Sequence, residues 1–137
     1  MAIVIREVSD ADITQTCNIE HAAYNPNGPM PSTLFPGPFP PNSREMRVEQ
    51  IISMRKNDPT AQYLKAVDDE TGEQIAFAKW HTYTTPEAVA SAPMRPIPSA
   101  PGVNVEACKA FFGGLVTKKK EIMGIKPHLC MYCFQFD

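Results

Sequence analysis

The sequence has little net charge and lacks any long hydrophobic run. Thirteen Lys and Arg residues face fifteen Asp and Glu residues, so the formal net charge of the 137 residues is −2. That balance provides no positive field to attract nucleic acid or an anionic membrane. The N-terminal apolar run, residues 2–5, is too short for a secretory signal or a membrane span. We therefore expect an intracellular, cytoplasmic protein with neither a nucleic-acid nor a membrane partner.

The sequence also lacks the common motifs of catalytic and metal sites. No Ser-His-Asp order, HExxH motif, phosphate-binding loop or paired-carboxylate pattern can be found in it. It has four cysteines, and only Cys130 and Cys133 are close in sequence, within a predicted strand. Side chains three residues apart on a strand point to opposite faces, so these two thiols do not converge on one metal ion. We expect buried strand thiols and no metal site.

Proline is abundant where other features are scarce. The chain has 14 prolines in 137 residues, about twice the usual share of roughly 5%. They concentrate in two stretches, residues 25–42 and 84–103. Because proline fixes φ and donates no backbone hydrogen bond, both stretches are predicted to be loops, and their apolar residues favour ordered loops packed on a domain.

The hydrophobic pattern between these loops predicts a single domain of the α/β (α+β) class, spanning residues 1–137. The expected order is β-α-α-β-β-α-β, with a mixed, mostly antiparallel sheet and helices on its faces. The expected strands cover residues 2–8, 62–67, 74–83 and 128–136. The expected helices follow Ser9, Ser43 and Asn104 and end near residues 24, 57 and 124. Gly113 and Gly114 lie inside the last helix, which suggests close approach of another backbone.

His81 is the residue in this pattern with the most versatile chemistry. It follows Trp80 near the end of the long predicted strand. A histidine in that position could serve as a general base or as the wall of a pocket. More often a histidine in such a position is simply a half-buried polar residue of the sheet, and the sequence favours that interpretation over a functional one.

The order of elements and several local sequence segments resemble the GNAT superfamily of N-acetyltransferases, in particular a fungal branch. The similar segments are AIVIREVSDADI, NPNGPMPSTLFPGPFPPNS, REMRVEQIISMRKNDP, QYLKAVDDETGEQIAFAKWHTY and KKKEIMGIKPHL. They extend from residue 1 to about residue 129. The resemblance implies acetyl transfer from acetyl-CoA to the amine of a small molecule or peptide.

The resemblance also implies a cofactor side and an acceptor side. In the family, the strand that begins at His128 runs along the pantetheine arm and into an Arg/Gln-x-x-Gly-x-Gly/Ala loop that holds the pyrophosphate. That motif occurs nowhere in the 137 residues. Only the backbone of Phe134, Gln135 and Phe136 would face the pantetheine. The resemblance places the substrate-pocket candidates on the acceptor side: Trp80, His81, Tyr83, Tyr24 and Phe35.

Two functions follow as alternatives. One is an acetyl-CoA-dependent acetyltransferase, and the missing motif predicts that this chain is inactive alone. The other is a truncated, non-catalytic family member whose last strand is an exposed sheet edge. Such an edge favours pairing with a second copy or another partner, so a homo-oligomer is expected in that case.

Overall fold

A computed structural model of the chain describes residues 2–23, 28–94 and 96–134, with the side chains of 132–134 left out. These residues form two compact units, which are described separately. The first contains residues 2–23, 42–82 and 129–134, and the second contains residues 28–41, 83–94 and 96–128. The structure confirms the predicted α/β class. The prediction that the chain is one domain stays a prediction.

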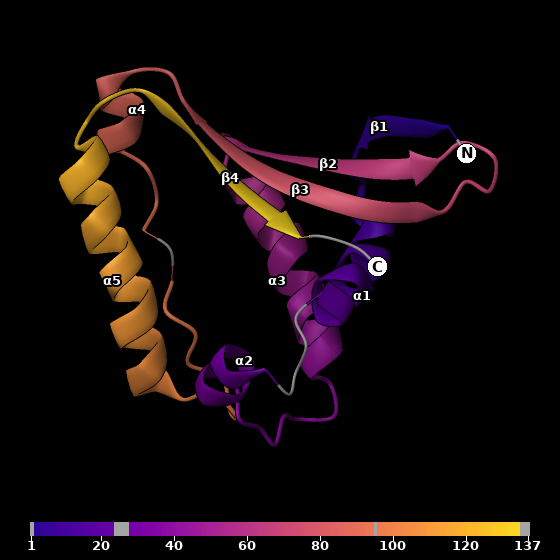
Figure 1. Ribbon diagram of the computed structural model, residues 1–137, viewed down its shortest axis with the longest axis horizontal. Helices are drawn as coiled ribbons and strands as arrows, with labels where there is room; N and C mark the ends of the chain where they lie inside the picture. Colours follow the sequence, from indigo (N-terminus) through magenta and orange to yellow (C-terminus); the bar gives the residue numbers. More distant parts are fainter. Residues whose placement is uncertain (1, 24–27, 95, 135–137) are drawn as a thin grey trace. The chain divides into compact units, whose positions relative to one another are not determined.

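The first unit is a four-stranded antiparallel sheet covered on one face by two helices (Figure 1). The strands lie in the order β1-β2-β3-β4. Their bounds are Ile3–Glu7 for β1, Ala61–Asp68 for β2, Gln74–Tyr83 for β3 and His128–Phe134 for β4. The helices are α1, Ile13–Ala23, and α3, Ser43–Asn57, and a 3₁₀ turn at Asp10–Asp12 precedes α1. The three expected strands from residue 2 to residue 83 and both of these helices are thus confirmed.

Capping chemistry sets the start of the first helical segment. The carboxylate of Asp12 accepts hydrogen bonds from the backbone N–H and the hydroxyl of Ser9, at 2.7 and 2.6 Å. This satisfies a backbone donor that the first turn leaves unpaired. The predicted cap at Ser9 is therefore confirmed, although it opens a 3₁₀ turn before α1 begins at Ile13.

The core of the first unit lies between the sheet and these helices. It consists of buried apolar residues from β1, α1, α3 and β2, namely Val8, Ile13, Cys17, Ile51 and Tyr63. The β2–β3 register places Tyr63 opposite Lys79 and Ala61 opposite His81. Residues directly opposite each other in a ladder share a face. His81 therefore points to the helix-covered face, and Trp80, the residue before it, points to the other face.

The second unit holds both proline-rich stretches, and it differs from the sequence expectation. Each stretch contains a short helix, α2 at Pro29–Leu34 and α4 at Pro86–Ala90. The prediction that these stretches are loops throughout was wrong. A proline needs no N–H partner at the first position of a helix, and both helices begin with proline. Thr85 also caps α4, because its hydroxyl accepts a hydrogen bond from the N–H of Ala88 at 3.1 Å.

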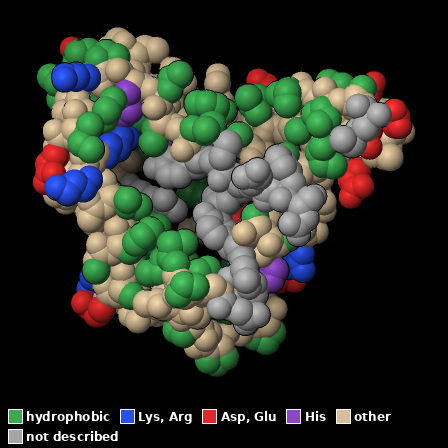
Figure 2. Space-filling view, in the orientation of Figure 1, with side chains coloured by type: hydrophobic (Ala, Val, Ile, Leu, Met, Phe, Trp, Pro, Cys, Tyr) green, Lys and Arg blue, Asp and Glu red, His purple; other side chains and the backbone are tan. Residues whose placement is uncertain are grey.

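The long helix of the second unit, α5 at Val105–Met123, matches its prediction. The side chain of Asn104 accepts a hydrogen bond from the N–H of Ala107 at 3.1 Å, and Gly124 ends the helix with a φ of 55°. Lysine side chains line α5 (Figure 2). Among the described residues, nothing outside the backbone of α5 itself lies within 4 Å of a Cβ added to Gly113 or Gly114, so the expected close approach of another backbone is not found there.

Backbone and side-chain bonds tie the two proline-rich stretches together. The N–H of Gly37 donates to the carbonyl of Gly102, and the N–H of Asn104 donates to the carbonyl of Leu34, both at 2.9 Å. The thiol of Cys108, which has no exposed surface, donates to the same Leu34 carbonyl at 3.7 Å. Burial raises the pKa of this thiol, so it stays protonated and able to donate. No helix among the described residues combines the length and the apolar character needed to cross a membrane.

Candidate functional site

The candidate site is built around His81, near the end of β3. The residue is buried, with 8% of its surface exposed. The ladder with β2 holds it in register opposite Ala61, and the N–H of Thr82 donates to the carbonyl of Thr60 at 3.1 Å. His81 therefore sits beside the turn that leads from α3 into β2.

That turn supplies the partners of His81. Asp58 is the C-cap residue that follows α3, and its N–H donates to the carbonyl of Met54 at 3.1 Å. Pro59 follows and cannot continue the helix. The Asp58 carboxylate then accepts from the N–H of Thr60 at 3.0 Å and from its hydroxyl at 2.6 Å. This closes a turn in which an aspartate replaces a backbone acceptor.

The imidazole of His81 completes the cluster. Its Nδ1 lies 3.2 Å from Oδ2 of Asp58 and 3.2 Å from Oγ1 of Thr60. The side chains of His81 and Asp58 are only 11% and 13% exposed. A carboxylate beside an imidazole in a place with little water fixes the orientation of the ring and stabilises its protonated form. Such a pair can take up a proton from a bound molecule.

Tyr63 lies on the same face of the sheet but cannot act as a base. Burial raises its pKa to about 12, so the phenol stays protonated near neutral pH. Its hydroxyl is buried and has no hydrogen-bond partner in the described part of the chain, and the Nζ of Lys79 lies 5.2 Å from the centre of its ring. Tyr63 can therefore only donate a proton or pack. His81 is the better proton acceptor on this face.

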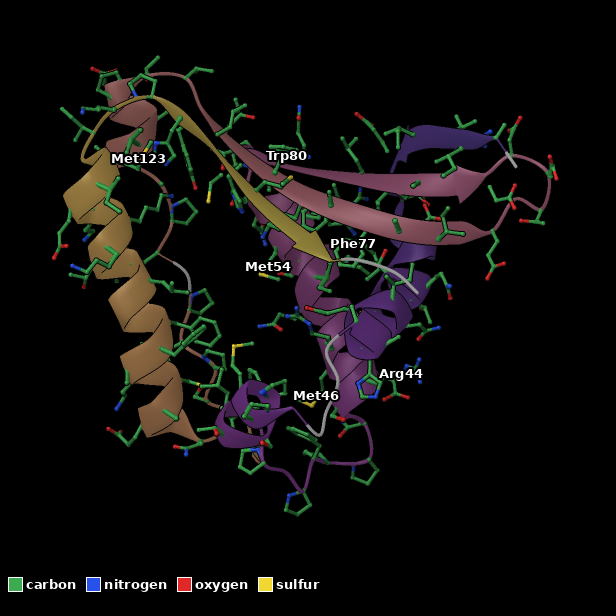
Figure 3. The ribbon with its side chains drawn as sticks, in the orientation of Figure 1. Arg44, Met46, Met54, Phe77, Trp80 and Met123 are labelled. Atoms are coloured by element: carbon green, nitrogen blue, oxygen red, sulfur yellow. The ribbon has the colours of Figure 1, made fainter. Side chains whose placement is uncertain are left out.

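The predicted site residues fall in different places. Trp80 lies on β3, on the face opposite His81, so the two do not form one pocket wall; it is labelled in Figure 3, together with Phe77 on β3 and Met54 on α3. Phe35 caps the end of α2 in the second unit and is 37% exposed. Tyr24, Gln135 and Phe136 lie outside the described residues, and Phe134 ends β4.

Tyr83 belongs to the second unit, where it is part of a different cluster. Its ring centre lies 5.0 Å from that of His128, and the Nζ of Lys119 lies 4.6 Å from the centre of the same ring. The Nδ1 of His128 contacts the carbonyl of Lys126 at 2.7 Å, which fits an N–H donor. Tyr83 is thus held by α5 and by the start of β4.

Sequence reasoning identified His81 but missed Asp58 and Thr60. The segment Asn57-Asp58-Pro59 indicated only the end of a helix. The contact with His81 depends on the pairing of β2 with β3, which brings the start of one strand to the end of the other. A hairpin prediction that fixed the register would have placed Ala61 opposite His81, and so the turn that holds Asp58 and Thr60 beside this end of β3.

Comparisons with known proteins give one structural likeness. No family model and no curated protein matches the chain. A solved structure described as histone acetyltransferase HPA2 and related acetyltransferase, from Corynebacterium glutamicum, is 18% identical in sequence. The match covers 87% of this chain and 72% of that one, with a TM-score of 0.43.

Proposed function

We propose that this chain provides the acceptor side of a GNAT-type N-acetyltransferase of the fungal branch. In this proposal His81 accepts the proton of the amine that receives the acetyl group. The observation that carries it is the buried pair formed by His81 and Asp58. The sequence resemblance of residues 1 to about 129 supports the reaction class. A cytoplasmic location and a small-molecule or peptide amine as acceptor are part of the proposal.

The reaction needs such a group because an amine is protonated near neutral pH. An ammonium has no lone pair, so it must lose a proton before its nitrogen can bond to the acetyl carbon. A well-placed general base contributes roughly 10²- to 10⁴-fold to a rate. Histidine suits this role because its unperturbed pKa lies near neutrality.

The residues of this chain do not fit the pyrophosphate of acetyl-CoA. The Arg/Gln-x-x-Gly-x-Gly/Ala sequence is absent from all 137 residues. At α5, a helix that follows a glycine-containing loop, the side chain of Asn104 already occupies a backbone donor of the first turn. The proposal therefore assigns no residue to the nucleotide and limits this chain to the amine and the transferred group. It replaces the expectation that the missing motif leaves the chain inactive alone with transfer from a donor whose pyrophosphate the chain does not hold.

Calorimetric titration with two acetyl donors tests the proposal. We expect acetyl-CoA to bind with a Kd below about 1 mM, an affinity of roughly 4 kcal/mol. Acetyl-pantetheine, which lacks the nucleotide, should bind nearly as well, because no residue here grips the pyrophosphate. Absence of binding for both donors up to several millimolar, an affinity weaker than about 3 kcal/mol, would contradict the proposal.

A second candidate function is self-association through β4. Among the described strands this one is the last in the sheet order, and Leu129 and Met131 on it are 65% and 49% exposed. A sheet edge with exposed apolar side chains favours pairing with another chain. Sedimentation velocity should then show concentration-dependent dimers that Leu129→Lys removes. A monomer at all concentrations would exclude this function.

A further inference from the structure

The arrangement of His81, Asp58 and Thr60 determines which atoms carry the hydrogens of the Thr60 hydroxyl and the His81 ring. Neutral imidazole carries one hydrogen, on either Nδ1 or Nε2, and only the other nitrogen can accept a proton. The partners of one nitrogen therefore identify the basic one. All three residues belong to the first unit.

The hydroxyl of Thr60 has one hydrogen, and the geometry shows where it goes. Its Oγ1 lies 2.6 Å from Oδ1 of Asp58, a short distance typical of a hydroxyl donating to a carboxylate. With that hydrogen used, Oγ1 can only accept along its contact with Nδ1 of His81 at 3.2 Å. The hydroxyl thus faces the ring as an acceptor.

The second oxygen that faces the ring is also an acceptor. Oδ2 of Asp58 lies 3.2 Å from the same Nδ1, and an ionised carboxylate has no hydrogen to donate. Two acceptors converge on Nδ1, so this nitrogen must carry the hydrogen. In the neutral ring, Nε2 is then the nitrogen with the lone pair.

Backbone bonds keep the two acceptors in place. The N–H of Thr60 donates to Oδ1 of Asp58 at 3.0 Å, and the N–H of Ala61 donates to the carbonyl of Asp58 at 3.1 Å. The N–H of Thr82 holds the carbonyl of Thr60 at 3.1 Å, next to the ladder pair of Ala61 and His81. The Asp58 carboxylate cannot turn away from the ring without losing the bond from the Thr60 N–H, and the Thr60 hydroxyl cannot turn away without losing its own bond to that carboxylate.

We propose that Asp58 and Thr60 are positioning residues that hold His81 with its hydrogen on Nδ1, so that Nε2 is the nitrogen that takes the proton. The catalytic consequence of this inference rests on the proposed acetyl transfer. The assignment of the hydrogen does not, because it follows from the contacts of Nδ1 with Asp58 and Thr60. Asp58 stabilises the imidazolium formed when Nε2 gains the proton, and Thr60 orients Asp58.

Nuclear magnetic resonance of the full chain labelled with ¹⁵N-histidine tests the assignment. At pH 8, long-range proton–nitrogen spectra distinguish a ring nitrogen that bears hydrogen from one that does not. We expect the wild-type spectrum to show hydrogen on Nδ1 of His81 and none on Nε2. Hydrogen on Nε2 in the wild type would overturn the inference.

Variants separate positioning from a merely structural role. In Asp58→Asn the side-chain amide can donate to Nδ1, so the hydrogen of His81 should move wholly or partly to Nε2. Thr60→Val should shift the same signals in part, and Thr60→Ser, which restores the hydroxyl, should return them. The control is Asp69→Asn, because that carboxylate is 54% exposed and pairs with Arg6 on the surface. It should leave the His81 signals unchanged.

The outcomes distinguish this inference from the proposed function. If the Asp58→Asn spectrum equals the wild type, Asp58 does not set the tautomer and the inference fails. If Asp58→Asn does not fold, the wild-type spectrum and the two Thr60 variants decide. If hydrogen lies on Nδ1 as expected but no acetyl donor binds, the tautomer assignment stands and acetyl transfer fails. Where transfer occurs, Asp58→Asn should lower kcat by about 10²-fold or more and leave KM nearly unchanged.

Discussion

Oδ2 of Asp58, at the end of α3, lies 3.2 Å from Nδ1 of His81, near the end of β3. The contact joins the end of a helix to the end of a strand, and both side chains are largely shielded from water. Buried polar groups of this kind are costly when they lose a partner. The same contact therefore affects both the stability of the first unit and the chemistry proposed for it.

The first prediction concerns stability. Asp58→Ala removes the acceptor of the Thr60 hydroxyl and the Thr60 N–H, and the carboxylate that lies 3.2 Å from Nδ1 of His81. Leaving buried donors unsatisfied should lower the free energy of unfolding by about 1–3 kcal/mol. Urea denaturation followed by circular dichroism measures this change. The exposed carboxylate of Asp69 is the matched control, and Asp69→Ala should cost less than about 0.5 kcal/mol.

The second prediction concerns Gly102 in the second unit. Its φ is +86°, and a Cβ at this position would lie 2.6 Å from the carbonyl oxygen of Pro38. Gly102→Ala combines an unfavourable backbone conformation with a clash, so we expect a loss of about 2–4 kcal/mol. Gly72→Ala is the control, because Gly72 has a φ of +74° but open space around it. It should cost only about 1 kcal/mol. Equal thermal stabilities of the two variants would show that the close approach to Pro38 is absent.

The third prediction is a gain in stability. Gly113 and Gly114 lie inside α5, and neither has a neighbour within 4 Å of an added Cβ. Alanine restricts the unfolded chain and favours the helix, so each of Gly113→Ala and Gly114→Ala should add up to about 1 kcal/mol. Thermal unfolding measures the gain. A loss of stability in either variant would mean that another backbone does approach this part of α5.

The fourth prediction concerns pH. Burial alone would raise the pKa of Asp12, but hydrogen bonds from Lys65 and Ser9 outweigh it and lower the pKa to about 2. A carboxyl with a lowered pKa in the folded state contributes stability above its unfolded value of 3.8, and that contribution is lost as the pH falls towards 2. Urea denaturation across this range should show a shallower decline for Asp12→Asn than for the wild type. Glu49→Gln, at an exposed position of α3, should follow the wild-type curve.

The sequence predicted the elements whose ends are marked by local chemistry. β3 matches its predicted bounds, and α5 begins after Asn104 and ends at Gly124 as expected. The short helices α2 and α4 escaped prediction because their prolines, placed at the first turn, are compatible with a helix. Position in the sequence alone does not show whether a proline begins a helix or prevents one.

The candidate site was predictable only in part, because two of its residues are brought together by the register of the strands. His81 has a recognisable side chain on a recognisable strand. Asp58 and Thr60 become its partners only through the register of β2 against β3, which depends on a bulge between Ala66 and Val67 further along the ladder. The sequence also placed Trp80 with His81, although neighbouring residues of a strand face opposite sides.

The most direct test of the account is acetyl transfer by the wild type and by His81→Gln. Free thiol released from acetyl-CoA or acetyl-pantetheine is measured with a primary amine, a polyamine and a lysine peptide as acceptors. The account predicts amine-dependent release that His81→Gln lowers by about 10²- to 10⁴-fold, while circular dichroism and donor binding stay unchanged. Equal rates in the two proteins, or no release with any acceptor at saturating donor, would contradict it.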